Sequence, residues 1–164
     1  MLAARTKTRV TSTQVLARTP QSDTAPRYSL LLSTEPDEVR AAQRLRHRVF
    51  ADELGAVLHT SEPGLDVDRF DAFCDHMLVR EENTGEIVGN YRMLPPAAAA
   101  RAGGLYSEGE FVLDELAPLR SSLVETGRSC VHPDHRSGAS SSSTNSPSEY
   151  SPPARAAAAG GSIR

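Results

Sequence analysis

Residues 131–139, with the sequence VHPDHRSGA, contain the residue types of an anion-binding turn. An extended stretch ends at Val131, Pro133 turns the chain, and Arg136 precedes three small residues. Backbone N–H groups of small residues can point at a phosphate, and a guanidinium can donate two parallel hydrogen bonds to it. We therefore predict a phosphate-binding turn. Its candidate cofactor-binding residues are Val131, Arg136, Ser137, Gly138 and Ala139.

The same segment offers two other chemistries, and we favour neither. His132, Asp134 and His135 have side chains that bind zinc, but ligands so close together on a turn rarely converge on one tetrahedral centre. Cys130 and His132 would share one face of a strand, yet no third group is evident that would orient the histidine for nucleophilic catalysis. We therefore expect no metal ion.

The phosphate-binding turn would be stronger if a helix followed it, because a helix N-terminus adds a partial positive charge. Four serines at 140–143 and Pro147 form a helix poorly. Ser, Pro, Ala and Gly dominate residues 140–164. Such a segment cannot offset an ordering entropy of about 1–2 kcal/mol per residue. We predict that residues 140–164 form a disordered tail.

The elements that would position this turn are an apolar strand and an amphipathic helix. Residues 28–33 form a short apolar run, as in a buried strand. Thr34 and the acidic residues after it predict a helix start, and Gly55 predicts its end. Between them, apolar residues recur at helical spacing and basic residues occupy the other side. The apolar positions are Val39, Ala42, Leu45 and Val49.

Three further strands are predicted after this helix. Residues 76–80 and 87–94 alternate as strands do, and the turn chemistry of Asn83 to Gly85 joins them into an antiparallel hairpin. Residues 97–102 are a loop or a short helix, and residues 123–131 are the next strand. One side of another short helix would be lined by Phe111, Leu113, Leu116 and Leu119.

Composition and charge restrict the class of protein. Four of the 18 basic side chains lie in the first 22 residues, which contain no acidic side chain, so the rest of the chain has 14 basic against 21 acidic side chains. An acidic body argues against a nucleic-acid binder. No apolar run approaches the length that spans a bilayer. The two cysteines, Cys74 and Cys130, suit reduced thiols in a cytoplasm.

Residues 1–26 lack periodicity and contain two prolines, which predicts a disordered leader before a folded unit at 27–139.

Several segments, in chain order, carry a resemblance to a known superfamily. They are LRHRVF (45–50), ELG (53–55), the acidic loop with Asp71, GNYRMLP (89–95), EGEF (108–111), ETGR (125–128) and VHPDHRSGA (131–139). Together they resemble the GNAT N-acyltransferases, and within them the branch of ornithine N-acyltransferases and acyl-homoserine-lactone synthases. The resemblance covers about residues 28–139. It implies an α/β (α+β) fold with a mixed, mainly antiparallel sheet flanked by helices.

The resemblance also implies a reaction and its participants. The amine of ornithine would attack a fatty acyl thioester, giving lyso-ornithine lipid. The donor would be the phosphopantetheine arm of an acyl carrier protein, or acyl-CoA, with no permanently bound cofactor. The implied partners are acyl carrier protein and a small amine or amino acid, with no nucleic acid and with peripheral membrane association allowed. The expected localisation is cytoplasmic.

Site residues follow from the same resemblance. Glu125 would organise the amine, directly or through water, and a structural ion pair with Arg128 or Arg92 is an equally open role for it. Arg46, Arg92 and Arg128 would join Asp68, Asp71 or Glu125 in an arginine–carboxylate network on the acceptor side. For Arg46 and Arg92 we favour a structural role. The candidate substrate-binding residues are Arg46, Asp71, Arg92 and Arg128.

Two departures from the family pattern matter. The lactone synthases place a tryptophan after the helix, and this chain has none, which favours the ornithine branch. Family members also continue past the glycine of the turn with an apolar helix and further strands, where this chain has the Ser/Pro/Ala tail. We therefore expect a C-terminally truncated enzyme with impaired activity. An acetyl-CoA-dependent GNAT acetyltransferase and an inactive fragment remain alternatives.

Overall fold

The computed structural model of the protein describes residues 13–21, 23 and 25–136. The predicted tail 140–164 and the turn residues Ser137, Gly138 and Ala139 lie outside the described residues, as do residues 1–12. Five strands form one sheet in the order β1-β2-β3-β4-β5, and every neighbouring pair is antiparallel. The strands are β1 (Gln14–Arg18), β2 (Tyr28–Ser33), β3 (Asp75–Glu81), β4 (Ile87–Leu94) and β5 (Glu125–Val131).

The antiparallel hairpin of β3 and β4 is confirmed. Its turn begins after Glu81, whose carboxylate accepts hydrogen bonds from the backbone N–H groups of Asn83 and Thr84 at 3.0 and 2.7 Å. Gly85 closes the turn with φ +75°, a left-handed conformation that suits glycine. Leu78 and Asn90 are partners in the middle of the hairpin. Together with the antiparallel pairing of all five strands, this hairpin confirms the predicted, mainly antiparallel sheet.

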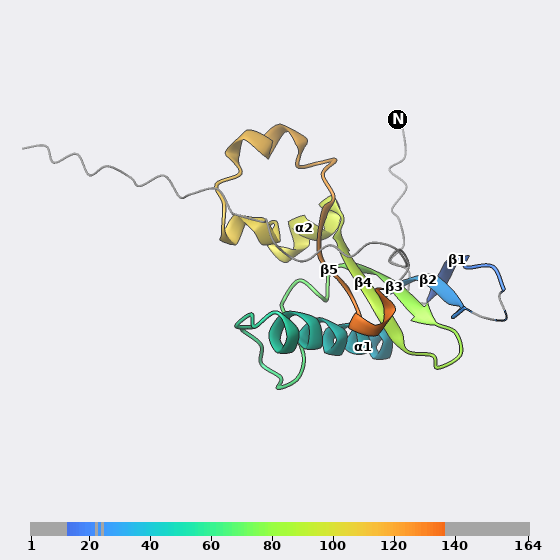
Figure 1. Ribbon diagram of the computed structural model, residues 1–164. Coiled ribbons are helices and arrows are strands. Elements are labelled where there is room, and N and C mark those ends of the chain that lie inside the picture. Colours follow the sequence, from blue (N-terminus) through green and yellow to red (C-terminus); the bar gives the residue numbers. More distant parts are fainter. Residues whose placement is uncertain (1–12, 22, 24, 137–164) are drawn as a thin grey trace, which may run out of the picture.

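Helix α1 (Pro36–His47) lies along one face of the sheet and continues into the π-helix η1 (Arg48–Glu53) (Figure 1). The predicted cap, Thr34, is wrong by one residue, because Glu35 is the N-cap and makes no side-chain capping bond. The serine hydroxyl of Ser33 instead accepts a hydrogen bond from the Glu35 N–H at 3.0 Å. Gly55 follows η1 with φ +71°, as the predicted helix end requires.

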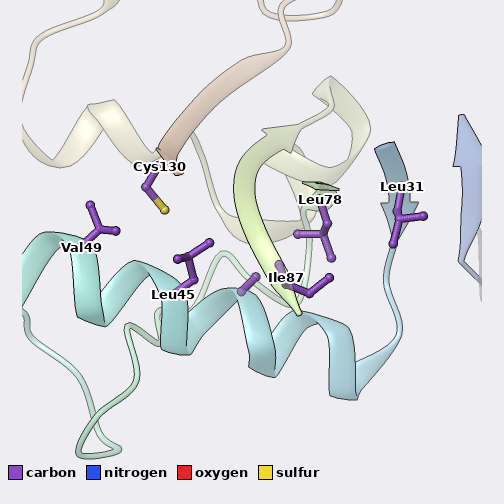
Figure 2. Close-up of a cluster of buried hydrophobic side chains, with 7 residues drawn as sticks. Leu31, Leu45, Val49, Leu78, Ile87 and Cys130 are labelled. Carbon is purple, nitrogen blue, oxygen red and sulfur yellow. The ribbon is translucent and has the colours of Figure 1, made fainter. Parts of the chain in front are cut away.

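The main hydrophobic core lies between α1 and the sheet, as Figure 2 shows. Leu45 and Val49 of α1 and η1 point toward the sheet, where Leu78, Ile87 and Cys130 face them. The predicted apolar stripe is thus the packed face of the helix. A second cluster lies beneath α2 (Pro96–Ala102) and consists of Phe70, Cys74, Leu94, Ala98, Ala99, Ala102 and Leu105.

The segment between β4 and β5 loops away from one end of the sheet (Figure 1). It contains α2 and the 3-10 helices η2 (Tyr106–Gly109) and η3 (Asp114–Leu119). The predicted apolar side of a helix over 111–119 is wrong, because Phe111 and Leu119 are exposed. Pro118 lies inside η3, where the missing N–H disfavours a regular α-helix.

The N-terminal segment corrects one prediction. The interpretation of residues 1–26 as a disordered leader is wrong for Gln14–Arg18, which form the edge strand β1 against β2. All five residues of β1 are exposed, so the sequence lacks the alternation of apolar and polar residues that would predict this strand. Backbone pairing and the contact of the Thr13 hydroxyl with Ser33 and Glu38 hold it in place.

Strand β5 contains a bulge that matters for the site. Arg92 pairs with Gly127 and Asn90 with Cys130, so Tyr91 faces two residues of β5, Arg128 and Ser129. One extra residue in a strand exchanges the faces of everything that follows it. The bulge thereby turns Cys130 into the core and leaves Val131 exposed. The last described element is the 3-10 turn η4 (Pro133–His135).

Candidate active site

A pocket of about 380 Å³ opens beside β5, between the bulge and the segment that follows α2. Its wall contains aromatic rings from η1, from the loop before β3 and from η2, and charged side chains from β4 and β5. Polar groups gathered in an otherwise apolar concave site are typical of a small-molecule pocket. The lining residues used below are Phe50, Arg92, Tyr106, Glu125 and Arg128.

Arginines and aspartates form a buried cluster behind this pocket. Arg46 is fully buried and donates from Nε to the Asp66 carboxylate at 3.0 Å. Its two Nη groups donate to the two oxygens of Asp71 at 3.0 and 2.8 Å. A bidentate pair of this kind fixes both partners. We call the residues Arg46, Asp66, Asp68, Asp71 and Arg92 the buried ion-pair cluster.

Asp71 lies at the centre of this cluster. Arg92 donates from Nη1 to Asp71 Oδ1 at 2.9 Å and to both oxygens of Asp68 at 2.8 Å. Gln43 of α1 donates to Asp71 Oδ2 at 3.0 Å. Burial alone would raise the pKa of Asp71, but Arg46 and Arg92 hold that pKa well below its ordinary value. Asp71 is therefore a carboxylate shared by two guanidinium groups.

Ion pairs join the predicted arginines and aspartates in a network in the structure, and two members differ from the prediction. Asp66 belongs to it and was missed, because an aspartate in a loop gives no periodic signal. Glu125 does not belong to it: no ion pair joins Glu125 to Arg92 or Arg128 within the described chain. Arg128 lies at the edge of the network, 3.5 Å from Asp66 and 3.7 Å from Asp68.

Glu125 lies at the start of β5, lines the pocket and is held by hydrogen bonds from η2. Its Oε2 accepts the backbone N–H of Tyr106 at 2.6 Å. Its Oε1 accepts the N–H and the hydroxyl of Ser107 at 2.9 and 2.5 Å. A carboxylate has about four acceptor positions. Three donors therefore orient Glu125 and leave it room for one further hydrogen bond, on the side of Oε2.

The backbone of Arg128 is unusual. Its φ is +53°, and within the described chain it is the one non-glycine residue with positive φ. The side-chain amide of Asn90 donates to the Arg128 carbonyl at 2.7 Å and fixes this conformation. The guanidinium lies 5.2 Å from the ring centre of Tyr106 and 5.8 Å from that of Phe50. Backbone strain of this kind is frequent at binding sites.

Buried titratable groups surround the cluster without taking part in its ion pairs. His76 is fully buried, and its pKa is lowered mainly by that burial. Burial also raises the pKa of Cys74 to about 12 and that of Cys130 to about 11. Neither thiol is a thiolate at neutral pH, so neither has the state of a nucleophile. Both cysteines are free.

The predicted phosphate-binding residues that the structure describes lie at the other end of β5. Val131 is exposed, and the Arg136 Nε donates back to the Val131 carbonyl at 2.9 Å. The two Nη groups of Arg136 donate to Glu53 at 2.5 and 2.7 Å. This exposed hydrogen-bonded pair holds the pKa of Glu53 below its ordinary value. We call the residues from Val131 to Arg136 the strand end.

Two further findings concern metal ions and membranes. Among the described residues, no three His, Cys, Asp or Glu side chains are grouped so that they could hold a metal ion. In the same part of the chain, no helix combines the length and the apolar character needed to cross a bilayer.

Comparison with known proteins identifies the class. Residues 45–145 match the acetyltransferase (GNAT) domain family, and the chain belongs to that family. The resemblance found in the sequence is therefore confirmed. The match includes the buried ion-pair cluster, the pocket and the strand end.

Particular relatives narrow the class. The chain is 43% identical over 122 residues to the L-ornithine N(alpha)-acyltransferase of Rhodobacter capsulatus, covering 68% of this chain and 46% of that protein. It is 39% identical over 130 residues to the enzyme of the same name from Rhizobium meliloti, covering 71% and 44%. An acyl-homoserine-lactone synthase of Vibrio anguillarum is 32% identical over 92 residues, covering 56% and 46%.

The chain thus spans about half the length of the curated relatives it matches. Among solved structures, the AHL synthase LasI aligns with a TM-score of 0.46 at 16% identity, covering 71% of this chain and 59% of that one.

Proposed function

We propose that this chain acts in N-acyl transfer to the α-amine of ornithine, with a fatty acyl thioester of acyl carrier protein as donor. The relatives named as L-ornithine N(alpha)-acyltransferases support the acceptor, at 36–43% identity over 108–130 residues. Membership of the GNAT family supports the reaction type. The product would be lyso-ornithine lipid.

The observation that most supports this proposal is the state of Glu125. Three donors hold its carboxylate at the pocket wall, and its fourth acceptor position is open. An amine or a bound water can take that position. Glu125 is thus a candidate catalytic residue in a fixed orientation, which is what a group that receives a proton needs.

The proposed step balances as follows. The neutral amine nitrogen attacks the thioester carbonyl carbon, and a C–N bond forms. Glu125 receives the amine proton, directly or through one water. The C–S bond then breaks, and the thiol of the phosphopantetheine arm leaves with that proton. Backbone N–H groups near the end of β5 are our candidates for stabilising the tetrahedral oxyanion.

For the donor, we propose that Arg136 and the small residues after it hold the phosphate of the phosphopantetheine arm. Arg136 now pairs with Glu53 at an exposed position, where an ion pair contributes little and can exchange its partner. A phosphate could therefore replace the glutamate. Acyl-CoA offers the same phosphate chemistry, so the donor must be tested directly.

The test is a product assay on this chain. Ornithine is incubated with 3-hydroxyacyl carrier protein or with acetyl-CoA, and products are identified by mass spectrometry. The proposal predicts N-acyl-ornithine from the carrier-protein thioester, and its loss in Glu125→Gln. An acetylated amine alone would establish the acetyltransferase alternative.

The inactive-fragment alternative is separated by binding. If no product forms, melting temperatures are measured with and without acyl carrier protein. Stabilisation by the carrier protein would show a surviving donor site without turnover. No product and no stabilisation would overturn the proposal for this chain.

A further inference from the structure

We infer that Arg128 binds the carboxylate of the acceptor, so that the pocket selects α-amino acids over amines that lack this group. The inference rests on the proposed function and adds the chemical basis of acceptor choice. It depends on three observations, which are the bulge, the unequal pairing of the three arginines and the position of Glu125.

The bulge places Arg128 on the same side of β5 as Glu125. In a regular strand, alternate residues share a face, so residues 125 and 128 would point to opposite faces. The extra residue in β5 removes this opposition, and both side chains line the same pocket. The left-handed φ of Arg128 is unfavourable in a residue with a side chain. A fold that retains this cost at one arginine of a pocket points to a function for that side chain.

The three arginines near the pocket differ in what they still can bind. Arg46 uses Nε and both Nη groups in hydrogen bonds to aspartates, and Arg92 donates from Nη1 to two aspartates. Arg128 forms longer ion pairs, 3.5 Å from Asp66 and 3.7 Å from Asp68, and no hydrogen bond joins it to either carboxylate. Its Nε is buried without a hydrogen-bond partner, and its Nη2 makes a 3.3 Å contact with the Tyr106 hydroxyl.

This difference makes Arg128 the guanidinium that an entering acid would meet. The nearest carboxylates, Asp66 and Asp68, are already hydrogen-bonded to Arg46 and Arg92. Arg128 and the two arginines of the cluster together balance the three aspartates of the cluster, so the anionic neighbours do not exclude another acid. A carboxylate would give the arginine the two parallel hydrogen bonds that it lacks.

Glu125 completes the recognition of a zwitterion. Its open acceptor position suits an ammonium or amine group, whereas Arg128 suits a carboxylate. An α-amino acid has both groups on one carbon. Glu125 can therefore bind its amine while Arg128 binds its carboxylate. Tyr106 connects the two, since its backbone N–H donates to Glu125 and its ring lies beside Arg128.

The experiment compares L-ornithine with 1,4-diaminobutane, which is ornithine without its carboxylate. With the unaltered chain, we expect acyl transfer to ornithine to exceed transfer to the diamine. In Arg128→Gln, kcat/KM for ornithine should fall about 10–100-fold, as for a lost hydrogen bond to a charged group, mainly through KM. Transfer to the diamine should fall less, so the ratio of kcat/KM for ornithine to kcat/KM for the diamine should drop. Arg101→Gln, an exposed arginine outside the pocket, is the matched control.

Arg128→Lys keeps the charge but loses the two parallel N–H donors of the guanidinium. We expect it to retain more ornithine activity than Arg128→Gln but less than the unaltered chain. Equal losses with both amines in Arg128→Gln would mean that Arg128 is only structural, and would overturn the inference. Circular dichroism checks that each variant is folded.

A binding readout separates this inference from the proposed function. L-Ornithine should raise the melting temperature of the unaltered chain more than the diamine does, and Arg128→Gln should remove that difference. If no acyl transfer occurs with either amine but this difference appears, the proposed function fails and the inference stands. Equal stabilisation by both amines would overturn this inference but not the proposed function.

Discussion

The buried ion-pair cluster and the strand end use the same chemistry in opposite surroundings. Arg46 has no exposed surface, and Asp71 is 8% exposed, whereas the side chains of Arg136 and Glu53 are 42% and 34% exposed. Both regions contain bidentate arginine–carboxylate pairs. They therefore differ in burial rather than in geometry.

Burial decides what each pair can do. Removing charges from water is costly, so a buried pair persists only while every partner is present. An exposed pair forms and separates at little cost. The cluster is thus a fixed support behind the pocket, and the strand end has a guanidinium that can change partners.

The largest effect should come from removing the shared carboxylate. Asp71→Ala leaves Arg46 and Arg92 without their common partner, and we expect it to lower the free energy of unfolding by about 3–5 kcal/mol. Urea unfolding followed by circular dichroism measures this. Glu53→Ala, which removes the exposed partner of Arg136, is the matched control and should leave the midpoint unchanged. Similar losses in both variants would erase the contrast between the regions.

Acid should weaken the cluster in a defined range of pH. The pKa of Asp71 lies below its ordinary value of 3.8, so the folded state favours the charged carboxylate. This stabilisation is complete above the unfolded pKa and is lost as the pH falls through the lower folded value. Melting temperatures below about pH 4 should therefore drop more steeply in the unaltered chain than in Asp71→Asn. Parallel curves would show that Asp71 does not depend on its arginines.

His76 should act in a different range of pH. Burial lowers its pKa below the ordinary 6.5, so the unfolded chain binds a proton that the folded chain does not. Stability then falls as the pH drops below 6.5 and stops changing from this source below the folded pKa. His76→Gln should flatten the dependence of the melting temperature on pH just below pH 6.5 and leave the acid loss that depends on Asp71 in place. A curve that keeps its slope in the variant would contradict this assignment.

The sequence predicts the elements that have local signals. The β3–β4 hairpin and the packed face of α1 follow from alternation, turn residues and helical spacing, and both are present. Arg46 follows Ala42 by four residues and precedes Val49 by three, so its position on the buried side of α1 is readable from the same spacing. The arginine–carboxylate network was predictable to that extent.

Features that depend on distant pairing were not readable. The bulge at Arg128 and Ser129 exists only relative to Tyr91 on another strand, and nothing in ETGRSCV marks it. The donors that orient Glu125 lie 18 and 19 residues earlier, in a segment without periodicity. Strand β1 likewise has no apolar pattern and depends on the edge that β2 offers.

The smallest effect on stability, and the sharpest test of the contrast, concerns Arg136. Arg136→Gln should not change the melting temperature of the free chain, because its pair with Glu53 is exposed. It should reduce the stabilisation by acyl carrier protein, since the proposed phosphate contact is lost. Glu53→Gln should leave that stabilisation intact or increase it, because the guanidinium no longer has a competing carboxylate.

These two variants break the same ion pair but should differ in their effect on binding of the donor. If the pair itself supported the donor site, both changes would weaken binding equally. If Arg136 grips phosphate, only its own loss weakens binding. A titration of each variant with phosphopantetheine-loaded carrier protein, alongside carrier protein without the arm, therefore tells a phosphate contact from a structural one. The strand end would then be a binding site whose ion pair occupies it until the donor arrives.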